Sequence, residues 1–311
     1  MTARTRFLGI DGGGTKTEFV CIDEGGAVIA RAVTGNTYHL QIGLDEAVRR
    51  LGQGIDAICQ ELSITPAGFG YAFFGLPAFG EDSIMDPQLH AACGRLLGHD
   101  RYACGNDMIC GWAGSLGCED GINIVAGTGS IGYGERQGRS ARAGGWGEVF
   151  GDEGSAYWIA IQGLALFARM SDGRAPKGAL HGRIAEALSL RNDLELCERV
   201  TGSEKMGRDD IAALASLVSR AAAQGDVGAR AILSSAAREL VALATALRKS
   251  LDFAPDEPVR ISWSGGVLLN EPIVREAFIR SLAEAGPFAP VEPLYAPGYG
   301  AALYARRMGM P

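Results

Sequence analysis

The stretch Asp11–Thr17 holds the first residues whose types and spacing could do chemistry. It reads DGGGTKT, so a carboxylate and three glycines precede a threonine, a lysine and a second threonine. Small residues let a phosphate approach the backbone amides, and the Thr and Lys side chains add further donors. The same letters also fit a glycine-rich hairpin turn with a solvated lysine. Taken alone, the stretch does not decide between these two interpretations.

Two familiar phosphate-binding patterns do not fit the chain. The Walker pattern requires a glycine directly before Lys16, where Thr15 stands, and a long helix afterwards. The letters GTGSIG at 127–132 satisfy the G-x-G-x-x-G spacing, but YGERQGRSARAGG follows, with turn residues and no apolar helical stripe. We therefore predict a second hairpin loop there, with exposed amides and the hydroxyls of Thr128 and Ser130, in place of a dinucleotide fold.

A further carboxylate stands between an expected strand and an expected helix. Asp107 follows DRYACGN and precedes an apolar stretch expected to be helical over 108–116. An aspartate in that position often caps the helix. It can also orient a hydroxyl group and accept its proton as a bond forms.

Two more stretches have the composition of ligand-binding loops. GGWGEVFGDEGSA places Trp146 between glycines and then supplies Asp152 and Glu153, a combination that suits a sugar ring and its hydroxyls. The turn Ser264–Gly266 follows an expected strand, and without side chains it can lie flat against an adenine or a ribose. A structural loop in the first case and a ligand-free turn in the second are the alternatives.

The elements that must position these residues begin in the same way twice. Strands are expected over 7–10 and 18–23, on either side of the first loop, followed by a third strand and a helix with apolar residues at helical spacing from Leu44 to Ile58. The order strand, glycine loop, strand, turn and strand returns from residue 121. From Ser155 onward the chain is mostly helical, with an apolar stripe from Ile232 to Leu247 that faces a core. This repetition predicts a duplicated architecture with one phosphate loop in each half.

Composition excludes several classes of protein. The 311 residues carry a net charge of -7 with no basic block, which argues against a nucleic-acid surface. No apolar run reaches the length of a membrane span, and the first residues lack the apolar core of a signal peptide. The seven cysteines form no C-x-x-C pair and the four histidines show no metal-ligand spacing, so we expect reduced thiols in a cytoplasmic protein.

Four stretches together resemble one known family. GIDGGGTKTEFV, AGTGSIGYG, GGWGEVFGDEGSAYWIA and SGGVLLN, in this order, are similar to the N-acetylglucosamine kinase and BadF-type ATPase family of the actin, Hsp70 and sugar kinase superfamily. The resemblance covers nearly the whole chain and is most specific in the third stretch, which looks like the hexosamine kinases. It implies an α/β, two-domain actin-like ATPase (ribonuclease H-like) fold with a duplicated core and an interdomain cleft. We expect an N-terminal domain over 1–118, joined by the terminal helix at 297–311, and a C-terminal domain over 119–296.

The resemblance also implies a role for each motif. Asp11 would hold Mg²⁺, and Asp107 would be the catalytic base that accepts the proton of the sugar hydroxyl. The substrate-binding set would be Asn36, Asp107, Thr128, Gly129, Gly145, Trp146 and Asp152. The set that binds ATP would be Gly13, Gly14, Thr15, Lys16, Thr128, Ser264, Gly265 and Gly266. Asn36 is also a plausible turn residue after Gly35.

The activity implied is transfer of the γ-phosphoryl group of ATP to a hydroxyl of an amino sugar, the 6-hydroxyl being expected. The family also implies a homodimer. FFGLPAFGED replaces a Ser-Gly-Gly-type stretch of some hexosamine kinases, so glucosamine, N-acetylglucosamine and N-acetylmuramate all remain open. The alternative is a BadF-type ATPase that drives electron transfer to a partner reductase or dehydratase, for which Cys104, Cys110 and Cys118 would be the candidate cluster ligands. A sugar-sensing module without turnover is a third interpretation, which Asp11, Lys16 and Asp107 argue against.

Overall fold

The computed structural model describes residues 5–203 and 205–310, which form two compact units. One unit comprises the chain up to Asp120 together with the segment from Glu292, and the other spans Gly121–Val291. Each unit is built on one five-stranded mixed sheet with helices packed on it. The chain therefore has the predicted two-domain actin-like ATPase fold.

The first unit has the strand order β3-β2-β1-β4-β5. Antiparallel strands β1 to β3 form a meander, and β4 and β5 lie parallel to β1. The elements are β1 (Arg6–Gly12), β2 (Lys16–Asp23), β3 (Val28–Gly35), α1 (His39–Ile42), α2 (Leu44–Leu62), a 3-10 turn (Pro66–Gly68), β4 (Tyr71–Leu76), α3 (Met85–Leu97), β5 (Tyr102–Asn106), α4 (Met108–Leu116) and α13 (Pro297–Gly309).

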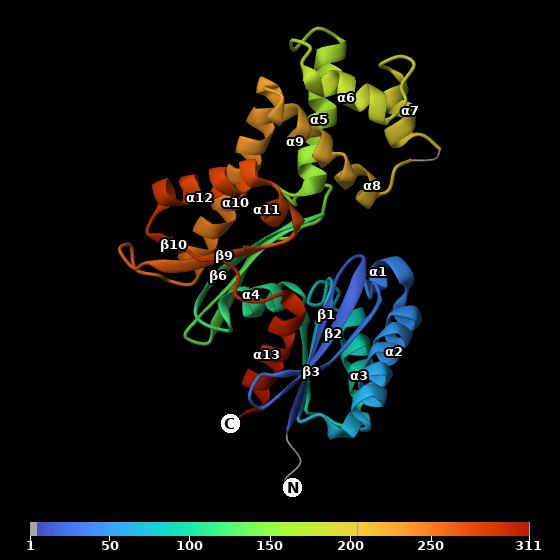
Figure 1. Cartoon of the computed structure of the whole chain (residues 1–311), viewed down its shortest axis with the longest axis vertical. Helices are drawn as coiled ribbons and strands as arrows, with labels where there is room; N and C mark the ends of the chain where they lie inside the picture. The colour runs from blue at the N-terminus through green and yellow to red at the C-terminus, as the bar shows by residue number, and fades with distance from the viewer. Residues whose placement is uncertain (1–4, 204, 311) are drawn as a thin grey trace. The chain divides into compact units, whose positions relative to one another are not determined.

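Helices cover both faces of this sheet (Figure 1). Alternating residues of β1 point to opposite faces, so Leu8 and Ile10 join the cluster beneath α2 and α3, whereas Phe7 joins the cluster beneath α13. The apolar stripe of α2 is buried as its spacing predicts, with Leu51 and Ile55 at most 1% exposed. The ends of the parallel strands are thereby held in place by a core on either side.

The second unit has the strand order β8-β7-β6-β9-β10, which matches that of the first unit when both are read from the meander. The predicted duplication is therefore confirmed. Strands β6 to β8 form the meander, and β9 lies parallel to β6. The elements are β6 (Gly121–Ala126), β7 (Ser130–Arg136), β8 (Arg139–Gly144), α5 (Ala156–Ser171), α6 (Ala179–Ala187), α7 (Glu195–Thr201), α8 (Arg208–Ala213), α9 (Ala215–Ala223), α10 (Val227–Ser250), β9 (Val259–Ser264), α11 (Gly266–Asn270), α12 (Pro272–Ala285) and β10 (Phe288–Pro290).

The core of the second unit lies between its sheet and α10, with α5, α9 and α12 packed around that helix. Leu240 and Leu247 of the predicted stripe are fully buried there, against sheet residues such as Ile124. The acidic pair Asp209 and Asp210 lies in the first turn of the short helix α8. Leu214 separates α8 from α9.

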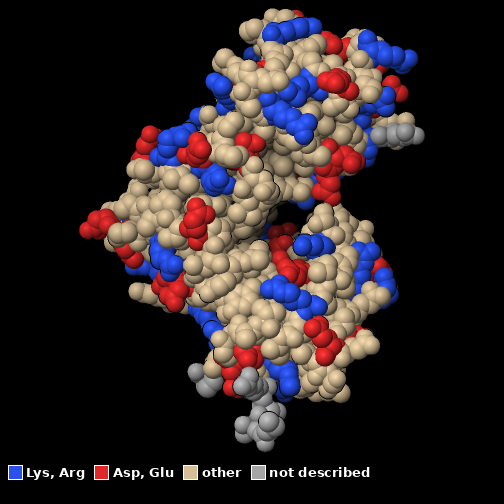
Figure 2. All heavy atoms as spheres, viewed as in Figure 1, with Lys and Arg blue, Asp and Glu red and all other residues tan. Residues whose placement is uncertain are grey.

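Charged side chains of both signs are interspersed on the face shown in Figure 2, which agrees with the absence of a basic block in the sequence. Within the described part of the chain, no helix combines the length and the apolar character that a membrane span requires.

Candidate active site

The first glycine loop is a hairpin connection, as predicted. Strands β1 and β2 pair antiparallel up to Gly12 and Thr17, and the Gly13 amide donates to the Lys16 carbonyl at 2.9 Å. Gly14, Thr15 and Lys16 are exposed at the tip. Their amides and side chains are therefore accessible to a ligand.

Asp11 and Asp107 lie at the same end of the first sheet, where its parallel strands β1, β4 and β5 end. Asp11 pairs with Gly75 at the end of β4, and Asp107 follows directly on β5, the neighbour of β4 on its other side. Gly75 has no side chain to separate the two carboxylates. A Cβ at Gly75 would lie 2.2 Å from the Cys110 sulfur, so the close packing of α4 on the sheet also requires glycine there. Sequence inspection did not assign a role to Gly75.

The environment of Asp11 disfavours its charge. Burial and, next, the Asp107 carboxylate raise the pKa of Asp11 from 3.8 to about 7. The side chain of Cys110 acts in the opposite direction by hydrogen bonding, and Lys16 does so by its charge. A cation bound between these two neighbouring carboxylates would reduce the repulsion between their negative charges.

Asp107 occupies the N-cap position of α4, but its side chain makes no capping hydrogen bond. The preceding residue, Asn106, makes the capping hydrogen bond instead. The side-chain oxygen of Asn106 accepts from the Met108 amide at 3.1 Å, and the Asn106 side chain is buried. Of the two interpretations of Asp107, the capping role therefore belongs to its neighbour.

The carboxylates at these strand ends are of the chemical type that binds a magnesium ion. Carboxylate oxygens are hard ligands of the kind that Mg²⁺ prefers, and Mg²⁺ commonly takes only one or two of them, together with phosphate oxygens and water. Among the described residues there is no group of three or more His, Cys, Asp or Glu side chains that could enclose a metal. Asp11 would thus hold the ion with the phosphates of a nucleotide.

Asn36 lies just beyond β3 and contacts the first loop. Its side-chain nitrogen donates to the Gly14 carbonyl at 3.0 Å and to the Gln41 side chain at 3.3 Å. Its side-chain oxygen accepts from Arg50 at 3.0 Å. The first unit therefore brings together Asp11, Asp107, Asn36 and the loop over 13–16.

The second glycine loop is also a hairpin turn, but the Ser130 hydroxyl that we predicted to be exposed is buried and donates to the Glu153 carbonyl at 2.7 Å. Ala126 pairs with Ser130, and the Gly127 amide donates to the Gly129 carbonyl at 2.9 Å. Strand β8 follows β7 where a dinucleotide fold would have a helix, so rejection of that fold is confirmed. The first amides of α5 donate to the carbonyls of Gly127 and Thr128, at 2.9 and 3.2 Å, which ties this loop to the helix.

The Gly–Trp–Gly stretch is an exposed loop after β8. Trp146 is 69% exposed, and the guanidinium of Arg142 lies 6.0 Å from its ring centre. Asp152, by contrast, is 3% exposed and adopts a left-handed backbone with φ of 56°. Its carboxylate accepts from Arg208 of α8 at 2.7 Å. Sequence inspection missed Arg208, because a single arginine at the start of a helix carries no signal.

A cavity of about 630 Å³ lies beside the second loop. Its walls come mainly from small and apolar side chains of α8, α9 and α11, and its polar groups include Asp209, Asn270 and Glu271. Thr128 and Gly266 also line it. The Ser264 hydroxyl instead accepts from the buried Asn123 side chain at 3.0 Å, so this serine secures the turn from inside.

Comparison with known proteins extends these observations. The sequence model of the BadF/BadG/BcrA/BcrD ATPase family matches residues 8–305. An N-acetylmuramic acid/N-acetylglucosamine kinase of Clostridium acetobutylicum is 32% identical over 270 residues, which cover 85% of this chain and 85% of the relative. An N-acetyl-D-glucosamine kinase of Dictyostelium discoideum is 30% identical, and the match covers 96% of this chain and 97% of the relative.

A crystal structure of a Chromobacterium violaceum protein superposes with a TM-score of 0.74 at 24% identity. The alignment covers 98% of this chain and 99% of that one. At this level of identity the likeness concerns the fold.

Proposed function

The chain belongs to the BadF/BadG/BcrA/BcrD ATPase family, and from that premise we propose that it is an ATP-dependent kinase of amino sugars. It transfers the γ-phosphoryl group of ATP to a hydroxyl of a sugar such as N-acetylglucosamine or glucosamine, and we propose the 6-hydroxyl. The observation that carries the proposal is that the Asp107 carboxylate follows directly on β5 and lies close enough to Asp11 to raise the pKa of Asp11. Two curated relatives at 30% identity or more, both named as kinases of N-acetylglucosamine, support this substrate class.

The first unit supplies the groups that act on the transferred phosphoryl. Phosphoryl transfer depends on positioning and charge neutralisation more than on covalent chemistry. Asp107 orients the attacking hydroxyl and accepts its proton as the new P–O bond forms. The loop over 13–16, in which residues 14–16 are exposed, binds the β- and γ-phosphates through backbone amides and the Lys16 ammonium. Magnesium, when bound through Asp11, neutralises phosphate charge.

The second unit supplies the remaining groups. The cavity beside Thr128 has the small, largely apolar lining that an adenosine requires, with Gly266 at its wall. We propose Thr128 and Gly129 as further donors to the transferred phosphoryl group. Trp146 presents an exposed aromatic face to the sugar. Asp152, which is buried and paired with Arg208, is the carboxylate that we propose for the sugar hydroxyls. Magnesium as the metal and a homodimer complete the proposal and rest on the family resemblance. A cytoplasmic location is also proposed and rests on the cysteine pattern of the sequence.

The positions of Cys104 and Cys110, two of the three candidate cluster ligands, disfavour the activator alternative. Cys110 is fully buried in α4, and burial raises the pKa of its thiol. Cys104 lies partly buried in β5 and interacts with the buried Cys93. Thiols held in this way are poor candidates for a cluster shared with another chain. Among the described cysteines only Cys197 is exposed.

The test is a coupled assay of ADP release over a panel of glucosamine, N-acetylglucosamine, N-acetylmuramate and glucose. We expect ADP release to require an amino sugar, with one phosphate appearing on the sugar per ADP. Phosphorus–proton couplings in the NMR spectrum of the product identify the hydroxyl. Hydrolysis of ATP at the same rate with and without sugar would overturn the proposal. Brown protein from anaerobic purification would favour the activator.

A further inference from the structure

Two neighbouring arginines of α2 share one carboxylate. Arg49 contacts Glu46 through Nε and Nη2, both at 2.6 Å, and Arg50 contacts it through Nε at 2.6 Å. Hydrogen bonds from Arg49 and Arg50 lower the pKa of Glu46 to about 2. The Arg49 side chain is 55% exposed and that of Arg50 is 26% exposed. The two arginines thus have a common partner but different surroundings.

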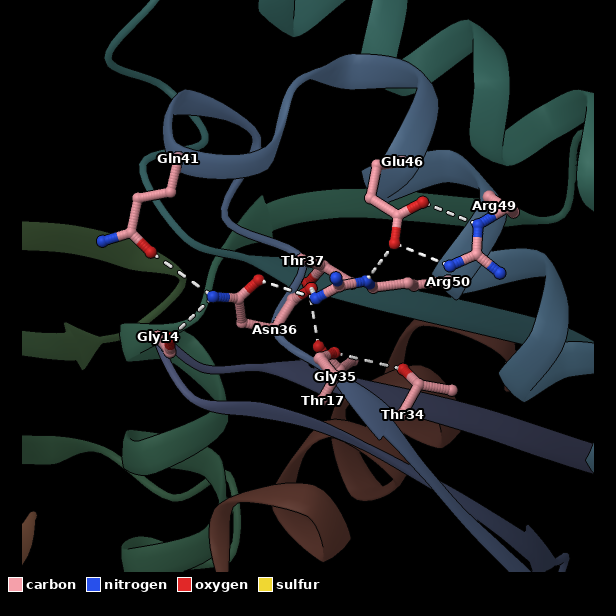
Figure 3. Close-up of polar contacts among 10 residues, drawn as sticks. All are labelled: Gly14, Thr17, Thr34, Gly35, Asn36, Thr37, Gln41, Glu46, Arg49 and Arg50. Carbon is pink, nitrogen blue, oxygen red and sulfur yellow. Dashed lines mark hydrogen bonds and ion pairs between the residues drawn. The ribbon is translucent and has the colours of Figure 1, made fainter.

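Of the two, Arg50 extends toward the first phosphate loop. Its Nη1 donates to the backbone oxygen of Asn36 at 2.9 Å and to the side-chain oxygen at 3.0 Å. Gly35 permits this approach, because a Cβ there would lie 2.7 Å from the same nitrogen. Figure 3 shows Asn36 between Arg50 on one side and Gly14 and Gln41 on the other.

The partners of Asn36 determine how its amide is oriented. A guanidinium can only donate hydrogen bonds, and a backbone carbonyl can only accept them. The Asn36 oxygen must therefore face Arg50, and its nitrogen must face the Gly14 carbonyl. Without the guanidinium, the Asn36 side-chain oxygen would lose this donor, and only the Gly14 and Gln41 acceptors would remain to orient the amide.

The contact with Gly14 determines in turn where the next amide points. In a trans peptide the C=O and the following N–H point in opposite directions. Because the Gly14 carbonyl faces Asn36, the Thr15 N–H points away from Asn36. A Cβ at Gly14 would meet no atom within 4 Å, so space around the loop does not restrict this peptide.

The base of the loop is fixed separately. The hydroxyls of Thr17 and Thr37 are hydrogen-bonded at 3.0 Å, and both residues are buried. This contact holds β2 to the segment after β3. The Arg50–Asn36 contacts act instead on the exposed tip.

We infer that Arg50 is a positioning residue for the first phosphate loop. It holds the Asn36 amide, which holds the Gly14 carbonyl, and so presents the Thr15 N–H to the β- or γ-phosphate of ATP. The inference rests on the proposed ATP-dependent kinase.

The experiment measures nucleotide binding by calorimetry on the full-length protein, with Mg²⁺ and without sugar. The ligands are the ATP analogue AMPPNP and AMP, which lacks the β- and γ-phosphates. Arg50→Ala should raise the Kd for AMPPNP about tenfold, as expected for one displaced donor to a charged group, and leave the Kd for AMP within about twofold. Arg49→Ala is the matched control, because it removes a contact to the same Glu46 without touching Asn36, and should leave both constants unchanged.

Two further variants separate positioning from general loss of structure. Arg50→Lys keeps the positive charge but not the guanidinium fork, and should restore AMPPNP binding only in part. Arg50→Ala added to Asn36→Ala should weaken AMPPNP binding no further than Asn36→Ala alone, because Arg50 acts through Asn36. Equal effects of Arg49→Ala and Arg50→Ala, equal weakening of AMP, full rescue by lysine, or additive losses would each overturn the inference.

The outcome is independent of the sugar. If no amino sugar is phosphorylated but Arg50→Ala weakens AMPPNP selectively, the proposed function fails and this inference stands. If the sugar is phosphorylated and Arg50→Ala binds AMPPNP as the unchanged protein does, the inference fails and the proposed function stands.

Discussion

The guanidinium of Arg208 lies 2.7 Å from the carboxylate of Asp152, across 56 positions of the chain. The Asp152 side chain is 4% exposed, and Arg208 also forms an ion pair with Glu148 at 3.1 Å. A Cβ on Gly129 would lie 2.6 Å from both partners, so this pair also packs against the second glycine loop. Arg208 therefore fixes the carboxylate proposed to bind the sugar.

Arg208→Ala is expected to raise the KM for the amino sugar at least about tenfold, because it leaves a buried carboxylate without its charged partner. The KM for ATP should change less than about twofold. Steady-state kinetics with each substrate varied in turn measure both constants. Arg208→Lys should recover part of the loss.

Arg280 provides the control for that experiment. It pairs with Glu276 at 3.8 Å, and both side chains are at least 67% exposed, so Arg280→Ala should leave both constants near their original values. Asp209, the next residue after Arg208, lines the cavity beside the second loop. Parallel increases in both KM values would therefore mean that α8 had shifted, and the specific role of Arg208 would be lost.

Asp107→Asn is expected to lower kcat by about three orders of magnitude while the sugar still binds, because an amide cannot accept the hydroxyl proton. Single-turnover kinetics measure the first quantity and calorimetry with the sugar the second. Asp100→Asn, at the exposed turn before the same strand, is the control. Transfer at near the original rate in Asp107→Asn would contradict the assignment of the base.

Asn106→Ala should affect stability instead. It removes the acceptor for the Met108 amide and should cost about 1 kcal/mol of unfolding free energy, as losses of helix caps do. Denaturant unfolding measures this cost. If Asp107→Asn proved to be the more destabilising of the two changes, the division of roles between these neighbours would be wrong.

Asp11→Asn should stabilise the protein at pH 8 in the presence of a chelator. The folded protein binds a proton on Asp11 more tightly than the unfolded chain does, because its pKa is raised from 3.8 to about 7. The resulting penalty is absent below about pH 4, grows as pH rises and is complete above about pH 7. Since one pKa unit corresponds to about 1.4 kcal/mol, the gain at pH 8 has an upper bound of about 4 kcal/mol.

Thermal unfolding between pH 4 and pH 8 tests this window. The difference in Tm between Asp11→Asn and the unchanged protein should grow across it, while Asp56→Asn, exposed on α2, should show no such trend. A difference that is constant with pH would show that the charge of Asp11 is not disfavoured by folding.

Trp146→Ala should raise the KM for the sugar much more than the KM for ATP, because the exposed indole offers a face to the sugar ring. We expect at least about a tenfold change in the first constant, on the scale of a lost aromatic contact. Leu194→Ala, which removes another exposed apolar side chain of the same unit, is the control. Equal changes in both constants for Trp146→Ala would remove the indole from the sugar site.

Sequence reasoning reached the loops and the carboxylates because their signals are local. A hairpin at Gly12–Thr17 and a strand that ends before Asp107 can be inferred from neighbouring residues. The contribution of Gly75 cannot, because it depends on β4 lying between β1 and β5, and strand order is a long-range property. The contact of Arg208 with Asp152 cannot be inferred either, because the two residues lie 56 positions apart in the sequence.

Arg49 and Arg50 show a second reason why a single sequence does not predict every functional side chain. In the sequence they are two successive arginines on a helix that begins with acidic residues, and either could form an i,i+3 or i,i+4 pair with Glu46. Only the path of the chain after β3 distinguishes the two arginines, because it brings Asn36 into hydrogen-bonding contact with Arg50. Side chains that act through a second residue leave no pattern in one sequence.

The shared strand order of the two sheets has an evolutionary consequence. Duplication of one ancestral half would leave such a pair of sheets, and equivalent positions can then be compared. Asp11 and Gly75 form the last pair of β1 and β4, and Val125 and Ser264 form the last pair of β6 and β9. One sheet thus carries an acid where the other carries a hydrocarbon side chain, so the repeated frame places this carboxylate in one half only.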